Sequence, residues 1–420
     1  MGTIALHSLA QLESGQLDGI KHLKISEKLT SFPRAIFRLT NSLEILDLSD
    51  NLLTDLPNEL VKLSKLKIIF ASQNKFKHLP SVLGKLPHLE MIGFKSNKIT
   101  RVPEESMPRQ LRWLILTDNQ VTKLPESLGY CHRLQKLALA GNQLTTLPNS
   151  LSQAKNLELV RISANHLNKC PDHLLTLPKL AWFAFAGNPF SRVTQQNKIV
   201  KTVAQIASID FSLEEILGQG ASGVIYKASW QNVPALLPKD IAVKVFKGQV
   251  TSDGYPEDEL LACLQVGHHE NLVQSLAQVK EQNCLALVMN LIPATYKNLG
   301  LPPSLKSCTR DTFNENFSLP IKVVAFIVEQ MQNVFTHMHQ QHICHGDLYA
   351  HNTLVNHQGK IIFGDFGASS PYQMLTIEQQ QHIKRIERRA LTHFIEDLLG
   401  ICDEKDKNTV AFKSLKDSVT

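Results

Sequence analysis

The first feature whose residue types could do chemistry is the glycine-rich motif Gly218-Gln219-Gly220-Ala221-Ser222-Gly223. Its backbone amides can approach phosphate oxygens closely because glycine has no side chain. Dinucleotide-binding folds share this spacing, and Asp240 stands twenty residues past Gly220, where such folds place an acid. Residues 224–230, however, have strand composition, whereas the dinucleotide motif must open a helix. Glycines between two strands instead predict a flap over the phosphates of a nucleoside triphosphate.

A lysine stands in the apolar segment that follows, Ile241-Ala242-Val243-Lys244. A charge among buried side chains is costly unless it is met, and a phosphate on one side with a carboxylate on the other would meet it. Glu259 is the candidate carboxylate, since the leucines around it give its segment a helical apolar face. Glu257 and Asp258 are close rivals, and a solvated acidic surface is the alternative.

Two further motifs lie downstream and are separated by a short spacer. They are His345-Gly346-Asp347-Leu348-Tyr349-Ala350-His351-Asn352 and Ile361-Ile362-Phe363-Gly364-Asp365-Phe366-Gly367. An H-x-D-L-x-x-x-N loop followed by D-F-G resembles the protein kinase family, and the resemblance covers about residues 211–399. It rests on the order and spacing of four motifs taken together.

The resemblance implies a role for each motif residue. Asp347 would accept the proton of the substrate hydroxyl, Asn352 and Asp365 would bind magnesium, and Lys244 would bind the phosphates of ATP. The cofactors implied are therefore ATP and Mg²⁺, and hard oxygen ligands are those that Mg²⁺ prefers. Gly367 would allow a sharp turn after the metal ligand, and His345 is interpreted as a buried structural histidine.

The remaining nucleotide contacts follow from the same resemblance. Apolar side chains would enclose the adenine, and the segment 289–292 would offer backbone groups to its edge. The residues expected to bind the nucleotide are Leu217, Gly218, Gln219, Gly220, Gly223, Ile225, Ala242, Lys244, Met289, Leu291 and Leu354.

The sequence departs from the kinase pattern in two places. Gly346 replaces the arginine that pairs with a phosphorylated activation loop, which puts such switching in doubt. Only 22 residues separate Asp365 from Glu387, which aligns with the usual aspartate of the following helix. H-G-D-L also occurs in related small-molecule phosphotransferases. Three hypotheses remain: an active protein Ser/Thr kinase, a small-molecule phosphotransferase, and a nucleotide-binding scaffold that transfers no phosphate.

The first half of the chain is repetitive. Asparagines recur at intervals of 22 or 23 residues, at positions 51, 74, 97, 119, 142, 165 and 188, and a proline follows each of the first six after six positions. Variants of L-x-x-L-x-L-x-x-N precede them. From about Leu23 to Phe190 the chain resembles the leucine-rich repeat family, whose stacked repeats bury a core that one repeat cannot bury alone. Such an array favours a protein substrate over a small molecule.

The strand positions of the repeats divide between core and surface. Leu46 and Leu48 alternate as in a short strand and should point into the core, and each asparagine amide should satisfy backbone groups at the turn. The residue before the second consensus leucine should face the concave side. It is apolar in six of seven repeats and predicts a protein-binding surface. The six residues are Ile45, Ile68, Met91, Trp113, Leu159 and Trp182; the alternatives are a misjudged register or a face covered by the kinase-like half.

Composition limits the remaining possibilities. The 420 residues are 43% hydrophobic and 20% charged, which excludes a mostly disordered protein, and the net charge of +6 without a dense basic run does not favour nucleic acid. No apolar run reaches the about 18 residues of a membrane span. Seven scattered cysteines and no signal segment predict a cytoplasmic protein, with secretion by a signal-independent route left open.

The expected fold combines an N-terminal leucine-rich repeat α/β solenoid with a C-terminal α+β bilobal kinase-like domain. The expected boundaries are residues 1–190 for the repeats with their cap, 191–210 for a linker, and 211–420 for a kinase-like domain whose helical lobe is short.

Overall fold

The computed structural model describes residues 5–192, 203–220, 222–231, 237–248 and 250–419. They form two compact units, Met1–Leu180 with Asn188–Phe190, and Ala181–Gly187 with Ser191–Thr420. Half of the linker expected at 191–210, residues 193–202, lies outside the described residues.

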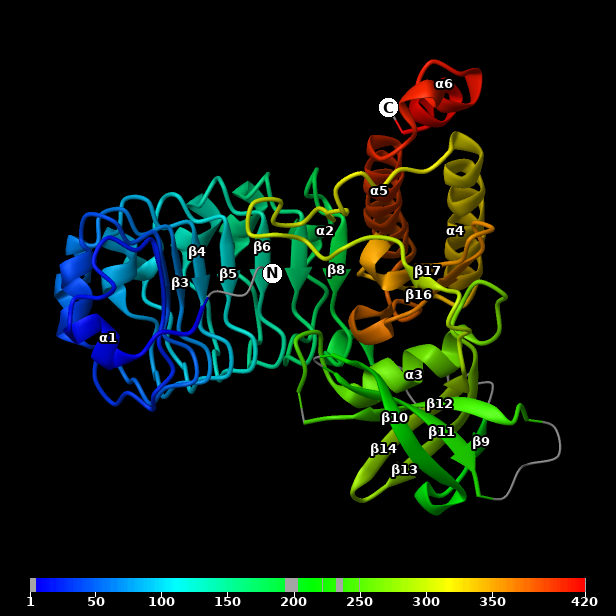
Figure 1. Cartoon of the computed structure of the whole chain (residues 1–420), viewed down its shortest axis with the longest axis horizontal. Coiled ribbons are helices and arrows are strands. Elements are labelled where there is room, and N and C mark those ends of the chain that lie inside the picture. The colour runs from blue at the N-terminus through cyan, green and yellow to red at the C-terminus, as the bar shows by residue number, and fades with distance from the viewer. Residues whose placement is uncertain (1–4, 193–202, 221, 232–236, 249, 420) are drawn as a thin grey trace. The chain divides into compact units, whose positions relative to one another are not determined.

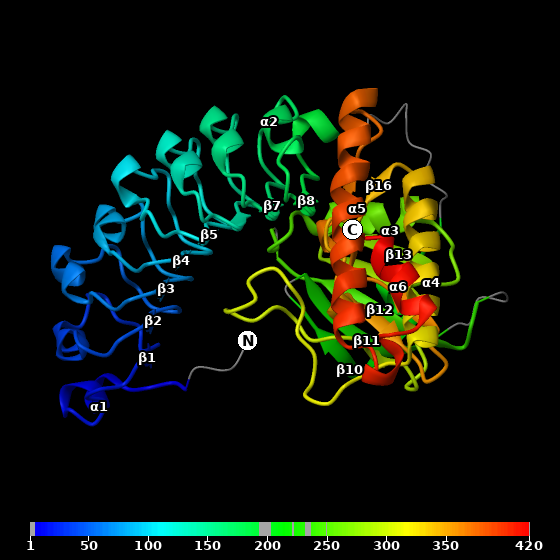
Figure 2. The same ribbon diagram turned by 90° about the horizontal axis from the view of Figure 1, so that it is seen from above.

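The repeat unit is built on a parallel sheet of three-residue strands. Adjacent strands pair in chain order, as His22 with Ile45 and Ile45 with Ile68 show. Figure 2 shows these strands along one side of the unit and short helical turns along the other. The strands are β1 (His22–Lys24), β2 (Ile45–Asp47), β3 (Ile68–Phe70), β4 (Met91–Gly93), β5 (Trp113–Ile115), β6 (Lys136–Ala138) and β7 (Leu159–Arg161).

Prolines precede the 3-10 turns of this unit. A proline precedes each of five 3-10 helices because its fixed φ suits the entry and it has no N–H to leave unpaired. The turns are η1 (Arg34–Leu39), η2 (Asn58–Lys62), η3 (Ser81–Lys85), η4 (Glu104–Ser106), η5 (Glu126–Tyr130) and η6 (Asn149–Gln153), with α1 (Leu9–Glu13) at the start and α2 (Asp172–Leu175) in the last turn.

A ladder of buried asparagine amides joins the repeats. Asn119 shows the pattern: its Oδ1 accepts from the backbone N–H of Ile99 at 2.9 Å, and its Nδ2 donates to the carbonyls of Phe94 and Leu116 at 2.9 and 3.0 Å. The residue before each asparagine has a positive φ, which even Ala164 adopts at 53°. Each asparagine therefore satisfies backbone groups that the left-handed turn leaves without partners.

The second unit begins with a twisted sheet of six strands. Its order is β10-β11-β12-β14-β13-β9, and helix α3 (Pro256–Val266) packs on one face through Leu260 and Leu264, beside Ala242 and Met289. Val243 and Val288 belong to the core on the other face. The strands are β9 (Ala204–Gln205), β10 (Phe211–Gln219), β11 (Gly223–Trp230), β12 (Asp240–Phe246), β13 (Ser275–Glu281) and β14 (Cys284–Asn290).

A largely helical part completes this unit. The long helices α4 (Ile321–Gln340) and α5 (Ile377–Gly400) lie side by side (Figure 1), and α6 (Val410–Asp417) follows them. Further short strands and 3-10 turns belong to this unit, and some of them lie within the motifs at 345–352 and 361–367. They are β8 (Trp182–Ala184), β15 (Lys297–Asn298), β16 (Ile343–Cys344), β17 (Thr353–Val355), β18 (Ile361–Phe363), β19 (Ser370–Pro371), η10 (Ala350–Asn352) and η11 (Phe366–Ala368). The predicted fold class, a solenoid followed by an α+β domain, is confirmed.

All seven cysteines are free thiols. Among the described residues, no helix combines the length and the apolar character needed to cross a membrane.

Candidate active site

The glycine motif lies at the turn between β10 and β11. The antiparallel pairing of these strands confirms that the glycines lie between two strands, and it shows that the dinucleotide interpretation, which needs a helix there, is wrong. Gly223 is required by packing, since a Cβ there would clash with the Val245 carbonyl oxygen on β12. A Cβ on Gly218 or Gly220 would meet no described atom within 4 Å. The first two glycines therefore border open space that phosphates could enter.

Lys244 on β12 makes an ion pair with Glu259 on α3. Its Nζ donates to Glu259 Oε1, and the two side chains are 11% and 3% exposed. Burial by itself would lower the pKa of Lys244, but the charges of Glu259 and Asp365 outweigh it and raise that pKa above its usual value. Of the rival acids, Glu257 pairs with Lys280 at the surface, and burial raises the pKa of Asp258 to about 6.

Asp347 and Asn352 are joined directly. The Nδ2 of Asn352 donates to the Asp347 carboxylate at 3.0 Å and to its carbonyl at 3.1 Å. The buried His345 supports the same loop, because its Nδ1 accepts from the backbone of Asp347 and its Nε2 lies 3.1 Å from the Gly364 carbonyl. His345 is therefore buried and hydrogen-bonded within the loop, as expected for a structural histidine.

The β17–β18 hairpin brings the two expected magnesium ligands to the same end of the unit. Thr353 pairs with Phe363, so Asn352 and Asp365 flank the paired ends, and Gly364 N–H donates to the Asn352 carbonyl at 3.3 Å. Asn352 turns its amide nitrogen to Asp347, and its remaining amide oxygen with the Asp365 carboxylate forms a donor set that fits Mg²⁺ with substrate phosphates. The left-handed residue at this turn is Asp365 itself, with φ 59°, so the expectation that Gly367 makes the turn was wrong.

Glu387 projects from α5 to the backbone of residues 345–352, the candidate catalytic loop. One carboxylate oxygen accepts from the amides of His345 and Gly346 at 2.8 and 3.0 Å. Burial raises the pKa of Glu387 to about 7, and the two amides only partly oppose that rise. The carboxyl therefore fixes the start of the loop that carries Asp347.

Family comparisons agree with this geometry. The protein kinase domain family matches residues 211–383, and leucine-rich repeat families match residues 42–63 and 109–167. The chain carries leucine-rich repeats followed by a protein kinase domain. The architecture expected from the sequence is thus confirmed.

Individual relatives cover parts of the chain. Serine/threonine-protein kinase CLA4 of Candida albicans is 29% identical over 162 residues, which are 37% of this chain and 15% of that protein. Mitogen-activated protein kinase kinase 1c of Physcomitrium patens is 22% identical over 180 residues, 40% of this chain and 44% of that one. A solved leucine-rich repeat protein of Leptospira interrogans is 25% identical with a TM-score of 0.36, covering 44% of this chain and 53% of that chain. The chain spans less than half the length of these two kinases.

The expected nucleotide-binding residues fall into two groups in the kinase domain. Ile225, Met289 and Leu291 pack in the same apolar cluster as Ala242. Leu217, on β10, is 48% exposed, and Leu354 is half-buried on β17, where it pairs with Ile362. The structure therefore brings together one wall of the predicted adenine site.

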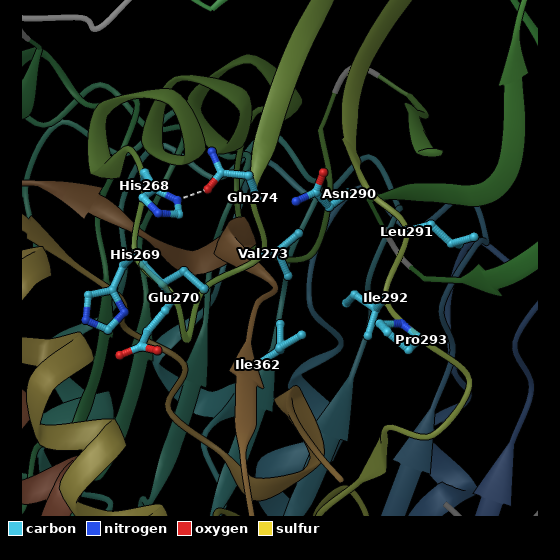
Figure 3. A pocket seen from close by; sticks show the side chains of 11 residues that line it. His268, His269, Glu270, Val273, Gln274, Asn290, Leu291, Ile292, Pro293 and Ile362 are labelled. Carbon is cyan, nitrogen blue, oxygen red and sulfur yellow. Dashed lines mark hydrogen bonds between the residues drawn. The ribbon is translucent and has the colours of Figure 1, made fainter. Parts of the chain in front are cut away.

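A cavity of about 190 Å³ lies beside the segment 290–293 of the kinase domain. Figure 3 shows Val273 and Ile362 near its centre and the imidazoles of His268 and His269 at one side. Among the expected nucleotide contacts, Leu291 lines it.

The kinase domain also uses two residues that the sequence analysis missed. Asp311 Oδ1 lies 2.6 Å from His351 Nδ1, and its other oxygen accepts from the backbone N–H of Ala350. The neighbouring Arg310 binds Asp397 on α5 at 2.6 Å. Nothing in the local sequence marks these residues, because their partners stand 39 to 87 positions away.

The predicted concave column does not form an exposed apolar patch. Its six members are only 1% to 8% exposed. They are Ile45, Ile68, Met91, Trp113, Leu159 and Trp182. Neighbouring strands lie close enough for side chains at this position to cover one another, as Lys136 does when its Nζ lies 4.3 Å from the ring of Trp113. For Trp182 the expectation of partner binding was wrong, because its indole packs on Tyr349 within the kinase-containing unit.

Proposed function

We propose that this protein is an ATP-dependent protein Ser/Thr kinase. The observation that carries the proposal is the Lys244–Glu259 ion pair, which leaves the lysine charged in a nearly buried strand near Asp365. A charge held there serves phosphate binding, and it is costly for a domain that binds no anion. The serine/threonine kinases among the relatives support the acceptor class.

In the proposed reaction the substrate hydroxyl oxygen forms a bond to the terminal phosphorus of ATP as the bond to ADP breaks. Asp347 accepts the hydroxyl proton. The amide of Asn352 donates to one oxygen of that carboxylate and so helps to orient it. Mg²⁺ bound by Asn352 and Asp365 would neutralise charge on the phosphates.

The test is incubation of the whole chain with labelled ATP and Mg²⁺, with a general protein substrate and with small hydroxyl compounds in separate reactions. We expect label on protein, and a loss of at least about 100-fold in Asp347→Asn and Asp365→Ala. Asp240→Asn changes an exposed carboxylate on β12 and is the matched control. Label that does not depend on Asp347 and Asp365 would contradict the mechanism, and label on small compounds alone would favour a small-molecule phosphotransferase.

We also propose that the repeat unit recognises a protein partner. The strip that supports this is Phe70, Gly93 and Ile115, which lie opposite one another on β3, β4 and β5. Phe70 and Ile115 remain partly exposed, and the Phe70 ring occupies the space where Gly93 lacks a side chain. An apolar strip of this kind suits an apolar segment of a protein substrate.

The partner proposal is tested with the Phe70→Glu and Ile115→Glu variants. We expect both to lose proteins that copurify with the wild-type chain and to lower phosphorylation of those proteins, with autophosphorylation unchanged. Val61→Glu, at an exposed apolar position on η2, is the control. Retention of the same proteins by all variants would exclude this strip.

A further inference from the structure

The segment Ala181–Gly187 precedes the matched kinase domain by more than twenty residues, yet it belongs to the same compact unit. Strand β8 lies within it, and Trp182, Phe183 and Phe185 are at most 2% exposed. Neither the family match nor the sequence pattern indicates a role for this segment in the reaction. Its contacts with the kinase domain suggest one.

Trp182 contacts the catalytic loop at two successive residues. Its indole N–H donates to the Leu348 carbonyl at 3.0 Å, and its ring stacks on Tyr349 with centroids 5.0 Å apart and an interplanar angle of 7°. The ring also stacks with His393 of α5, at 5.4 Å and 18°. Leu348 directly follows Asp347, so the indole links the loop to the rigid helix α5.

The same segment restricts which residue can stand at position 346, near the start of the catalytic loop. Gly346 has φ 70°, and a Cβ there would lie 2.8 Å from the carbonyl oxygens of both Phe183 and Ala368. Gly346 stands where protein kinases usually have an arginine. Beside β8, only glycine fits at this position. Asp347 is thus held between two residues that β8 contacts.

The segment reaches the chain beyond D-F-G as well. Ser370 Oγ accepts from the backbone N–H groups of Phe185 and Ala186 at 2.9 and 3.0 Å. Ser370 lies in β19, which pairs with β16 immediately before His345. One short segment therefore contacts both the catalytic loop and the strand that follows Asp365.

We propose that Trp182 is a positioning residue for phosphoryl transfer, which holds Asp347 in place through Leu348 and Tyr349. This inference rests on the proposed kinase function. Among the described residues, the hydrogen bond and ring contacts of Trp182 are to Leu348, Tyr349 and His393, not to Lys244. Its loss should therefore leave nucleotide binding nearly intact. What it should lower is the rate of transfer from bound nucleotide, because a mobile Asp347 seldom meets the acceptor.

The experiment compares full-length wild type, Trp182→Ala, Trp182→Phe and the controls Trp230→Ala and Trp230→Phe. Trp230 lies in the same unit and also donates through its indole N–H, to the Pro238 carbonyl at 2.9 Å, but on β11. We expect Trp182→Ala to lower kcat about tenfold or more while KM for ATP stays within about twofold. Trp182→Phe keeps a stacking ring and should lose less.

A second measurement does not require activity. Amide hydrogen exchange of peptides covering 345–352, read by mass spectrometry, should become about tenfold faster in Trp182→Ala and moderately faster in Trp182→Phe, and stay unchanged in the Trp230 variants. If Trp182→Ala fails to fold, Trp182→Phe decides the question. Unchanged exchange with unchanged kcat, or equal effects from Trp182 and Trp230 variants, would overturn the proposal. If the wild type transfers no phosphate, the kinase proposal fails, and exchange alone still decides whether Trp182 holds the loop.

Discussion

Replacing Glu387 by Gln should make the stability of the kinase domain less dependent on pH. The carboxyl is fully buried and one oxygen accepts two backbone amides, a role that the Gln carbonyl can keep. The pKa of Glu387 is about 7 in the fold, against the ordinary glutamate value of 4.5. Because the folded state holds the proton more tightly, this carboxyl stabilises the fold fully below pH about 4.5, and that contribution is lost as the pH rises through about 7.

The size of the effect follows from the pKa difference. At about 1.4 kcal/mol per pKa unit, the full contribution is about 3 kcal/mol, of which about 2 to 3 kcal/mol is lost between pH 5 and pH 8. The groups facing Glu387 should add little. His339, 3.9 Å away, has its pKa lowered to about 4 by burial, and the pKa values of Cys344 and Tyr372 are raised by burial. All three are neutral across this range.

The assay is urea unfolding of wild type and Glu387→Gln at pH 5, 6, 7 and 8. The variant should gain stability relative to wild type steadily from pH 5 to 8, and the gain should level off above pH about 8. Glu378→Gln, an exposed position in the first turn of the same helix, is the control and should show no such trend. A difference between variant and wild type that stays constant with pH would refute the reasoning.

Three further predictions concern single residues. Gly346→Ala should destabilise the kinase domain by about 2 to 3 kcal/mol in urea unfolding, since the added Cβ meets two carbonyl oxygens at a left-handed φ. Asn119→Ala should cost the repeat unit about 2 to 4 kcal/mol, because buried backbone groups lose their partner. Asn156→Ala removes only a solvent-exposed hydrogen bond to the His132 carbonyl and should change stability by less than about 0.5 kcal/mol. Ala164→Gly should raise the thermal midpoint, with a gain of about 1 kcal/mol from relief of its left-handed backbone; an unchanged or lower midpoint would contradict this.

Local features were predictable where residues close in sequence make them. The glycine motif lies in a hairpin because strand-forming residues flank it, and the asparagines bond to the backbone at intervals that the repeat period sets. The choice of Glu259 over Glu257 and Asp258 rested on helix periodicity alone, and the ion pair with Lys244 supports it.

Predictions about surfaces were less successful. The apolar column at Trp113 was expected to be exposed, but side chains on strands of adjacent repeats cover one another. The strip that remains partly exposed, at Phe70 and Ile115, depends on a glycine in the strand between them. Whether a side chain is exposed depends on the residues that are close to it in space. The residue pattern of one strand does not show which residues these are.

Periodicity and motif spacing determined the order of the two domains and, through the resemblance to protein kinases, selected Lys244, Asp347, Asn352 and Asp365 as the candidate site residues. The sequence was sufficient for these features because the interactions that produce them act within one turn, one hairpin or one repeat. Only the tertiary structure placed Trp182 against Tyr349, Asp311 against His351 and Glu387 beneath the catalytic loop. These pairs are separated by 40 to 167 positions, and aromatic rings and carboxylates carry no sequence signal for partners that the folding of the whole unit brings together.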